Sequence, residues 1–306
     1  MQSSTFAFTA GDGTGLFVYR WLPESAPRAV VQIAHGLAEH AGRYGRLAEA
    51  LTGAGYAVYA NDQRGHGRTA TTPADLGFFA PEGGWHKCVD DLWQIHRRIG
   101  ADHPGLPQVL LGHSMGSYLA QQFLGMHGEA LAGAVLSGSN GKPPPIAALG
   151  RLIARVERLR LGPRGTSPLL HALAFEPFNK PFAPARTPFD WLSRDAAEVD
   201  RYSADPLCGF RPRVQLWVDL LDGLAEIARP GLQARIPKRL PIYVFSGARD
   251  PVGANLKQLL AAYAAAGLAR VTARIYPEGR HEMLNETNRE QVSQDLIAWL
   301  DGALGR

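Results

Sequence analysis

The pentapeptide Gly112-His113-Ser114-Met115-Gly116 constrains the fold of this chain more than any other feature. It follows the short apolar run 108–111 and precedes residues 118–124, whose apolar side chains recur at helical spacing. The pattern therefore predicts a strand, a sharp turn and a helix. Glycines two positions before and after Ser114 let the strand and the helix pack closely around a turn that strains the serine backbone. The serine hydroxyl would project from the end of a strand, which makes Ser114 a candidate nucleophile.

A serine hydroxyl is a poor nucleophile at neutral pH, so a base must remove its proton and an acid must orient that base. Asp250 follows the β-rich run 241–245, and His281 lies shortly after the alternating run 271–276. Both residues are therefore expected on loops that leave strands, in the chain order Ser, Asp, His. The order and the spacing predict a catalytic triad of Ser114, Asp250 and His281.

Other residues compete for two of these roles. Asp219 and Asp222 are alternative acids, although residues 214–224 have the spacing of an amphipathic helix and neither aspartate follows a strand. The chain has ten histidines, so His281 also has rivals for the base.

Acyl transfer further requires hydrogen-bond donors for a developing oxyanion. The amide of Met115, which follows the candidate nucleophile, is one expected donor. The second should come from the loop after an earlier strand, and residues 29–34 form such a run directly before His35-Gly36-Leu37. The Leu37 amide is therefore the second predicted donor, and Gly36 permits the close approach of the backbone.

Strand and helix patterns alternate along most of the chain, which predicts an eight-stranded, mostly parallel sheet with helices on both faces. The expected strands are 5–9, 15–21, 29–34, 56–60, 108–111, 131–137, 241–246 and 271–276. The expected helices are 43–53, 85–99, 115–126, 253–266 and 288–301. In such sheets ligands bind at the carboxyl ends of the strands, where the candidate residues fall.

Several further motifs resemble those of α/β-hydrolases of the monoacylglycerol lipase and lysophospholipase type, which belong with the serine aminopeptidase S33 hydrolases. The matching segments are His35-Gly36-Leu37-Ala38-Glu39-His40 with Arg43-Tyr44, Asp62-Gln63-Arg64-Gly65-His66-Gly67, Gly112 to Gly116, Ser203-Ala204-Asp205-Pro206-Leu207, Ser246-Gly247-Ala248-Arg249-Asp250 and His281-Glu282. The resemblance implies a serine esterase that acts on a monoacyl lipid or a simpler ester and needs no cofactor. It matches Ser114, Asp250 and His281 to the triad, and Leu37 and Met115 to the oxyanion donors. Supporting positions in the turn and the loop are His35, Gly36, Gly112, His113 and Gly116.

The middle of the chain breaks the alternation, and we interpret residues 140–235 as a cap inserted between core segments 1–139 and 236–306. Prolines are frequent there, at 143, 144, 145, 163, 168, 177, 181, 184 and 188. Two stretches have apolar helical stripes: one comprises Leu152, Ile153, Val156 and Leu159, and the other lies within 216–224. Either they form an apolar lid that receives an acyl chain over Ser114, or they pack on the core.

The charge balance argues against nucleic-acid binding. The chain has 32 Lys and Arg against 28 Asp and Glu, and these charges are spread along its 306 residues rather than gathered on one face. One cluster stands out in the cap, comprising Arg151, Arg155, Arg158, Arg160 and Arg164. It either attracts an anionic lipid surface, which would make a peripheral membrane contact, or is a solvated helix face.

Metal and redox chemistry have little support in the sequence. Cys88 and Cys208 are isolated thiols, and His35, His40 and His66 lack the spacing of known metal motifs. We therefore expect no metal and no cofactor. The first residues lack the pattern of a secretory leader and no run of 18 apolar residues occurs, so a cytoplasmic location is expected.

These features predict a serine carboxylic-ester hydrolase that acts through an acyl-enzyme, with a small ester or monoacyl lipid as its partner. Two alternatives stay open at this stage. An amidase or exopeptidase could use the same triad, and would need acidic residues in the cap to hold a free amino group; the candidates are Glu157, Glu176, Asp190, Asp195 and Glu198. A ligand-binding receptor with slow turnover is the other. Dehalogenase and epoxide hydrolase chemistry is disfavoured, because an aspartate would then be expected in place of Ser114.

Overall fold

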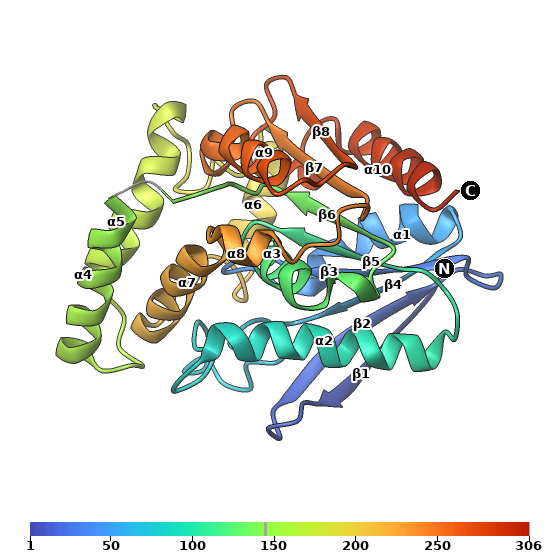
Figure 1. Cartoon of the computed structure of the whole chain (residues 1–306). Helices are drawn as coiled ribbons and strands as arrows, with labels where there is room; N and C mark the ends of the chain where they lie inside the picture. The colour runs from blue at the N-terminus through green and yellow to red at the C-terminus, as the bar shows by residue number, and fades with distance from the viewer. Residues whose placement is uncertain (144–145, 306) are drawn as a thin grey trace.

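A computed structural model describes residues 1–143 and 146–305 of the chain, so Pro144 and Pro145 of the predicted proline run lie outside it. Its centre is a single eight-stranded sheet in the order β1-β2-β4-β3-β5-β6-β7-β8 (Figure 1). The strands are β1 Gln2–Thr9, β2 Gly15–Leu22, β3 Ala29–Ala34, β4 Tyr56–Asn61, β5 Gln108–His113, β6 Gly133–Ser137, β7 Ile242–Gly247 and β8 Val271–Tyr276. Strand β2 pairs antiparallel with β1 and β4, and the other neighbours are parallel. The predicted α/β-hydrolase fold is confirmed.

Helices cover both faces of the sheet and explain its apolar strands. Helices α1 Gly45–Gly53 and α10 Arg289–Ala303 pack on one face, where Val109 and Leu111 of β5 point. The other face meets α2 Gly84–Asp102, α3 Met115–His127 and α9 Leu256–Ala265, and receives Leu110. Strands β3, β4, β5 and β7 are buried at every position, as expected of parallel strands between two helical layers.

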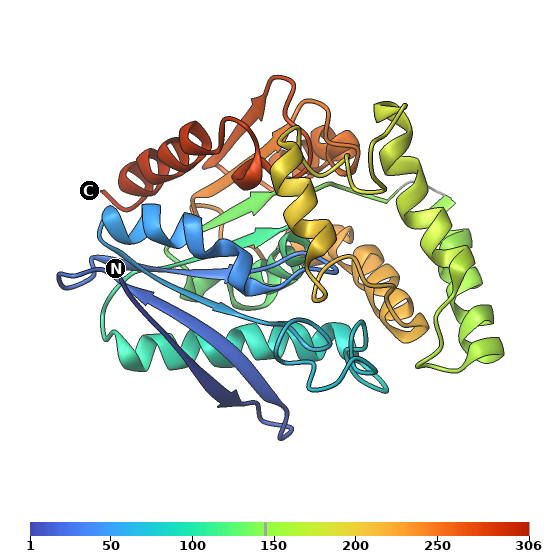
Figure 2. The ribbon, with the colours of Figure 1, turned by 180° about the vertical axis from the view of Figure 1, so that it is seen from behind.

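The segment that we interpret as the cap contains five helices within residues 146–233. They are α4 Ile146–Leu161, α5 Pro168–Asn179, α6 Ala196–Ala204, α7 Val214–Ile227 and α8 Pro230–Gln233. The predicted amphipathic helix within 216–224 is confirmed as part of α7, which packs on α2 and α3. Helices α4 and α5 lie outermost in both views (Figure 1, Figure 2).

The expectation that the stripe on α4 faces inward is wrong for most of its members. Leu152, Val156 and Leu159 are 58%, 52% and 85% exposed, and only Ile153 packs against the core. Helix α4 meets α7 through a mixed side: the guanidinium groups of Arg151 and Arg155 both bind Asp222 of α7, and Ile153 and Ala154 pack in the core cluster that contains α7 residues. Most of the apolar stripe is consequently left on the outer surface.

The arginine cluster of the cap is likewise not an unpaired cationic face. Besides the two arginines on Asp222, Arg160 binds Glu157 at 2.8 Å and Arg164 binds Asp75 at 3.2 Å. Arg158 donates to the side-chain oxygen of Gln215. In the described part of the chain, no helix combines the length and the apolar character that crossing a bilayer requires.

Candidate active site

Ser114 occupies the sharp turn between β5 and α3 that the sequence predicts. Its backbone has φ 50° and ψ −120°, a conformation that is strained for a residue with a side chain. Its N–H donates to the carbonyl oxygen of Ser137 at 2.9 Å, which fixes the turn to β6. A Cβ on Gly116 would lie 2.0 Å from the carbonyl oxygen of Ala34, and one on Gly112 would lie 2.3 Å from that of Gly116. The two glycines are therefore needed for the close packing around the serine.

Asp250 and His281 meet although 31 residues separate them. The His281 Nδ1 atom lies 2.9 Å from Asp250 Oδ1, and both side chains are almost fully buried. Asp250 also accepts hydrogen bonds from the Ser246 hydroxyl at 2.7 Å and the Val252 amide at 2.8 Å. These contacts hold the carboxylate in place, so that it orients the imidazole.

Burial and charge act in opposite directions on this pair. Burial raises the pKa of Asp250, but the charge and the hydrogen bond of His281 lower it by more, so the net pKa of Asp250 lies below its usual value. Burial lowers the pKa of His281, whereas Asp250, Glu282 and Glu39 raise it, and the net pKa is above 6.5. The carboxylate is ionised and the imidazolium is stabilised, as a general base requires.

The alternative acids lie elsewhere. Asp222 is engaged by Arg151 and Arg155, and Asp219 of α7 accepts from the Gln215 amide at 3.1 Å. Burial raises the pKa of Asp219 to about 6. Asp250, by contrast, contacts His281 directly.

The predicted oxyanion residues lie beside Ser114. Leu37, Met115, Ser114 and His281 all line one cavity. Met115 is the first residue of α3, and the N–H groups of a helix's first turn have no acceptor within the helix. Leu37 and Met115 therefore lie on the wall of the cavity that Ser114 also lines, and their role as oxyanion donors stays a prediction.

His35 holds the loop that follows β3, which contains Gly36 and Leu37. Its Nε2 atom accepts the Gln63 N–H at 2.9 Å, so its Nδ1 atom carries the proton and donates to the Gly36 carbonyl at 2.8 Å. Burial lowers the pKa of His35 to about 3, and that of His66 to about 3 as well. His113 bonds Ser137 Oγ at 3.1 Å, and its ring centroid lies 4.8 Å from that of His281.

The cavity has a volume of about 330 Å³ and is mainly apolar. Its far wall comes from cap residues on α5, α7 and the segment before α6: Ala174, Phe175, Phe178, Trp191, Leu192, Trp217, Leu220, Leu221 and Leu224. Helix α4, as far as its side chains are described, contributes none of the lining residues. The cap side of the cavity is therefore made by α5, α7 and the segment before α6.

Sequence reasoning from the triad missed a buried ionic network beside the cavity. Glu39, Arg43 and Glu282 join the loop after β3 to the loop that carries His281: Arg43 donates to Glu39 at 2.6 Å and to both oxygens of Glu282 at 2.7 Å. All three occur in the motifs His35 to His40, Arg43-Tyr44 and His281-Glu282, which would have indicated them as functional residues.

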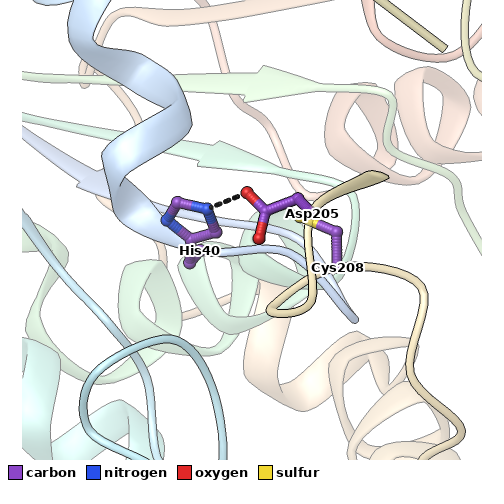
Figure 3. Close-up of side chains that lie close together, drawn as sticks. All are labelled: His40, Asp205 and Cys208. Carbon is purple, nitrogen blue, oxygen red and sulfur yellow. Dashed lines mark hydrogen bonds and ion pairs between the residues drawn. The ribbon is translucent and has the colours of Figure 1, made fainter. Parts of the chain in front are cut away.

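One group of side chains has the composition of a metal site. Ligand atoms of His40, Asp205 and Cys208 lie within 4.8 Å of one another in the part of the chain that the structure describes (Figure 3). His40 Nε2 and Asp205 Oδ2 are 2.9 Å apart, and Asp205 Oδ1 accepts the Leu207 amide. Burial raises the pKa of the Cys208 thiol strongly, which disfavours the thiolate that metals prefer. The group fits a structural link between the loop after β3 and the segment after α6.

The sheet order, the strained serine turn and the buried Asp250–His281 pair define a hydrolase of the α/β-hydrolase fold. A family model described as Serine aminopeptidase, S33 matches residues 25–288, and the chain belongs to this family. The resemblance predicted from the motifs is confirmed.

Relatives and solved structures refine this class. The chain is 32% identical to a monoacylglycerol lipase of Mycolicibacterium smegmatis over 95% of both chains. It is 30% identical to human monoglyceride lipase, with 94% of this chain and 88% of that protein covered. A thermostable carboxyl esterase from Bacillus coagulans, solved with glycerol, superimposes with a TM-score of 0.91 at 26% identity over 99% of both chains. The chain is therefore an α/β-hydrolase of the monoacylglycerol lipase and esterase type.

Proposed function

We propose that the protein hydrolyses carboxylic esters of single acyl chains through an acyl-enzyme on Ser114. The observation that carries the proposal is that Ser114, His281, Leu37 and Met115 all line one apolar cavity. The Asp250–His281 hydrogen bond of 2.9 Å supports the role of His281 as the base.

In the proposed mechanism, His281 removes the hydroxyl proton of Ser114 as the oxygen attacks the ester carbonyl. The Leu37 and Met115 amides stabilise the oxyanion, and Asp250 stabilises the imidazolium. The imidazolium then protonates the leaving alcohol. Water, activated by His281, attacks the acyl-enzyme and releases the acid.

The shape and chemistry of the cavity support a monoacyl substrate such as a monoacylglycerol or a lysophospholipid. A volume of about 330 Å³ is at the lower end of the range for small-molecule sites. Aromatic and leucine side chains from α5 and α7 would bury one aliphatic chain, at about 0.8 kcal/mol for each methylene. The M. smegmatis and human relatives, which are named monoacylglycerol and monoglyceride lipases, support the same choice.

The contacts of acidic residues argue against an exopeptidase. The acids considered in the cap do not line the cavity: Glu157 binds Arg160, Asp195 binds Arg289, Glu198 binds Arg201, Asp190 bonds Thr187, and Glu176 is exposed. The acids that do line it, Glu39 and Glu282, are both engaged by Arg43. An unpaired carboxylate for a substrate ammonium is therefore missing among the described lining residues.

A peripheral membrane contact through the cap is part of the proposal. Exposed apolar side chains gather on α4 and α5: Leu149, Leu152, Val156, Leu159, Leu169 and Leu173. An exposed apolar patch of this kind is typical of a surface that meets lipid or protein. A cytoplasmic location, on the sequence grounds given above, also remains part of the proposal.

Initial rates on nitrophenyl esters from acetate to palmitate, and on a monoacylglycerol, test this function. We expect Ser114-dependent rates that peak at medium or long chains. Ser114→Ala should lower kcat by about 10⁴–10⁶-fold. Retention of most activity by a folded Ser114→Ala protein would overturn the nucleophile assignment, and activity confined to acetate would overturn the monoacyl-lipid assignment.

A further inference from the structure

We propose that Glu39 is a positioning residue that sets the oxyanion loop against Ser114. Its Oε1 atom accepts the Gly36 N–H at 2.6 Å, and Gly36 directly precedes the predicted donor Leu37. The same oxygen accepts the Tyr44 hydroxyl at 2.9 Å, so the carboxylate is itself held in one orientation. This inference rests on the proposed function, because it assigns how one oxyanion donor is aimed.

The loop needs such an anchor because its backbone is strained and tightly packed. Ala38 has φ 56°, in the left-handed region that residues with a Cβ rarely adopt. A Cβ on Gly36 would lie 2.9 Å from Glu39 Oε1 and 3.2 Å from Ser114 Cβ. The loop therefore passes within van der Waals distance of the nucleophile, and a small displacement would move the Leu37 amide away from the oxyanion position.

Two sets of contacts hold this loop, one from the cap and one within the loop. From the cap, the Tyr202 hydroxyl and the Gly209 amide donate to the Ala38 carbonyl at 2.8 and 2.9 Å. Within the loop, the Glu39 carboxylate accepts the Gly36 N–H. A strained conformation persists only where the surroundings determine it in this way.

Arg43 gives the anchor a second role. A lone carboxylate near Ser114 would repel the developing oxyanion. Arg43 binds Glu39 and forms a bidentate pair with Glu282, so its positive charge offsets part of the charge of the two carboxylates. Glu282 is the neighbour of His281, so one guanidinium connects the oxyanion loop with the base loop. The network fixes the distance between the donor that stabilises the oxyanion and the base that transfers the proton.

Glu39→Ala and Glu39→Gln test the role in the full-length protein. The alanine variant removes the acceptor of the Gly36 N–H, and we expect kcat on a short nitrophenyl ester to fall by about 10²–10³-fold with KM nearly unchanged, as on loss of an oxyanion donor. Glutamine keeps an acceptor oxygen, so kcat of Glu39→Gln should be at least tenfold higher than that of Glu39→Ala. A trifluoromethyl ketone analogue should bind more weakly to Glu39→Ala by a similar factor.

Asp91→Asn is the matched control, because it disrupts another buried carboxylate pair, with Arg64 at 2.6 and 2.8 Å, outside the cavity lining. We expect its kcat within a few-fold of wild type. Equal kcat losses in Asp91→Asn and Glu39→Ala, or a change confined to KM, would overturn the proposal.

Amide hydrogen exchange at Gly36 and Leu37 gives a readout that does not depend on turnover. We expect exchange at these two amides to be at least tenfold faster in Glu39→Ala than in wild type, Glu39→Gln or Asp91→Asn. Unchanged exchange in Glu39→Ala refutes the anchor even if every ester proves inert, whereas inert wild-type protein with faster exchange in Glu39→Ala refutes only the proposed esterase function.

Discussion

Replacing Leu159 by serine should weaken the attachment of the protein to lipid vesicles by about 30-fold while leaving hydrolysis of a soluble ester unchanged. Leu159 is 85% exposed on the outer face of α4. Full burial of a leucine side chain is worth about 1.5–3 kcal/mol, so insertion of this one into the lipid interface contributes about 2 kcal/mol. Each 1.4 kcal/mol corresponds to a factor of ten in the partition coefficient.

The assay is co-sedimentation with phosphatidylcholine vesicles, at lipid concentrations that span half-saturation of the wild-type protein. Ile275→Ser is the matched control, because Ile275 is 48% exposed on the edge strand β8, outside the cap. We expect the control to partition like wild type. An exposed leucine has few packing partners, so Leu159→Ser should change the free energy of unfolding by less than about 0.5 kcal/mol.

The charge of the lipid provides a further check. Asp222 binds both Arg151 and Arg155 and offsets one of their two positive charges, so attachment through apolar side chains should depend only weakly on anionic lipid and on salt. Unchanged partitioning of Leu159→Ser, or an equal loss in Ile275→Ser, would refute the assignment of α4 as the lipid-facing surface.

Three further predictions concern the site and its support. Because the pKa of His281 is raised, kcat/KM should fall as pH decreases through a value above 6.5. Asp250→Asn should move this acidic limb of the pH–rate profile to lower pH and should lower kcat by about 10⁴-fold. Gly116→Ala should destabilise the protein by more than about 3 kcal/mol in urea unfolding, since the new Cβ would lie 2.0 Å from a β3 carbonyl oxygen; Gly302→Ala, in open space on α10, should be neutral or stabilising. Burial raises the pKa of Asp219 to about 6, so the native state favours its protonated form, and that stability is present below pH 3.8 and lost as pH rises through 6. Asp219→Asn should therefore stabilise the fold by up to about 3 kcal/mol at pH 8 but not at pH 3.5 in thermal unfolding.

The sheet could be predicted because its signals are local. Parallel strands covered on both faces are continuous apolar runs, and breakers such as Pro107 delimit them. The predicted strand ends consequently lie within three residues of those in the structure. The expected helix 253–266 instead begins with a 3₁₀ turn, Val252–Asn255, next to the Asp250 side chain, which accepts the Val252 N–H at 2.8 Å.

The orientation of the cap could not be predicted because an apolar stripe does not identify its neighbour. The stripe containing Leu152 and Leu159 fits a buried face and an outer lipid-facing surface equally well. What decides between them is the attraction of Arg151 and Arg155 for Asp222, which lies 67 to 71 positions further along the chain. Pairs at such separation leave no periodic signal in the sequence.

We propose different tasks for the two faces of the cap, and a second cavity lies between these faces. A second apolar cavity, of about 240 Å³, lies between α4, α5 and α7. It shares Ala174, Trp217 and Leu221 with the cavity beside Ser114 and also contacts Leu149 and Leu173 of the exposed patch. In the proposed lipid contact, an acyl chain that passed between these side chains on its way to the serine would avoid the cost of entering water, about 0.8 kcal/mol for each methylene. That contact would give the exposed leucines of α4 a role although they do not line the cavity beside Ser114.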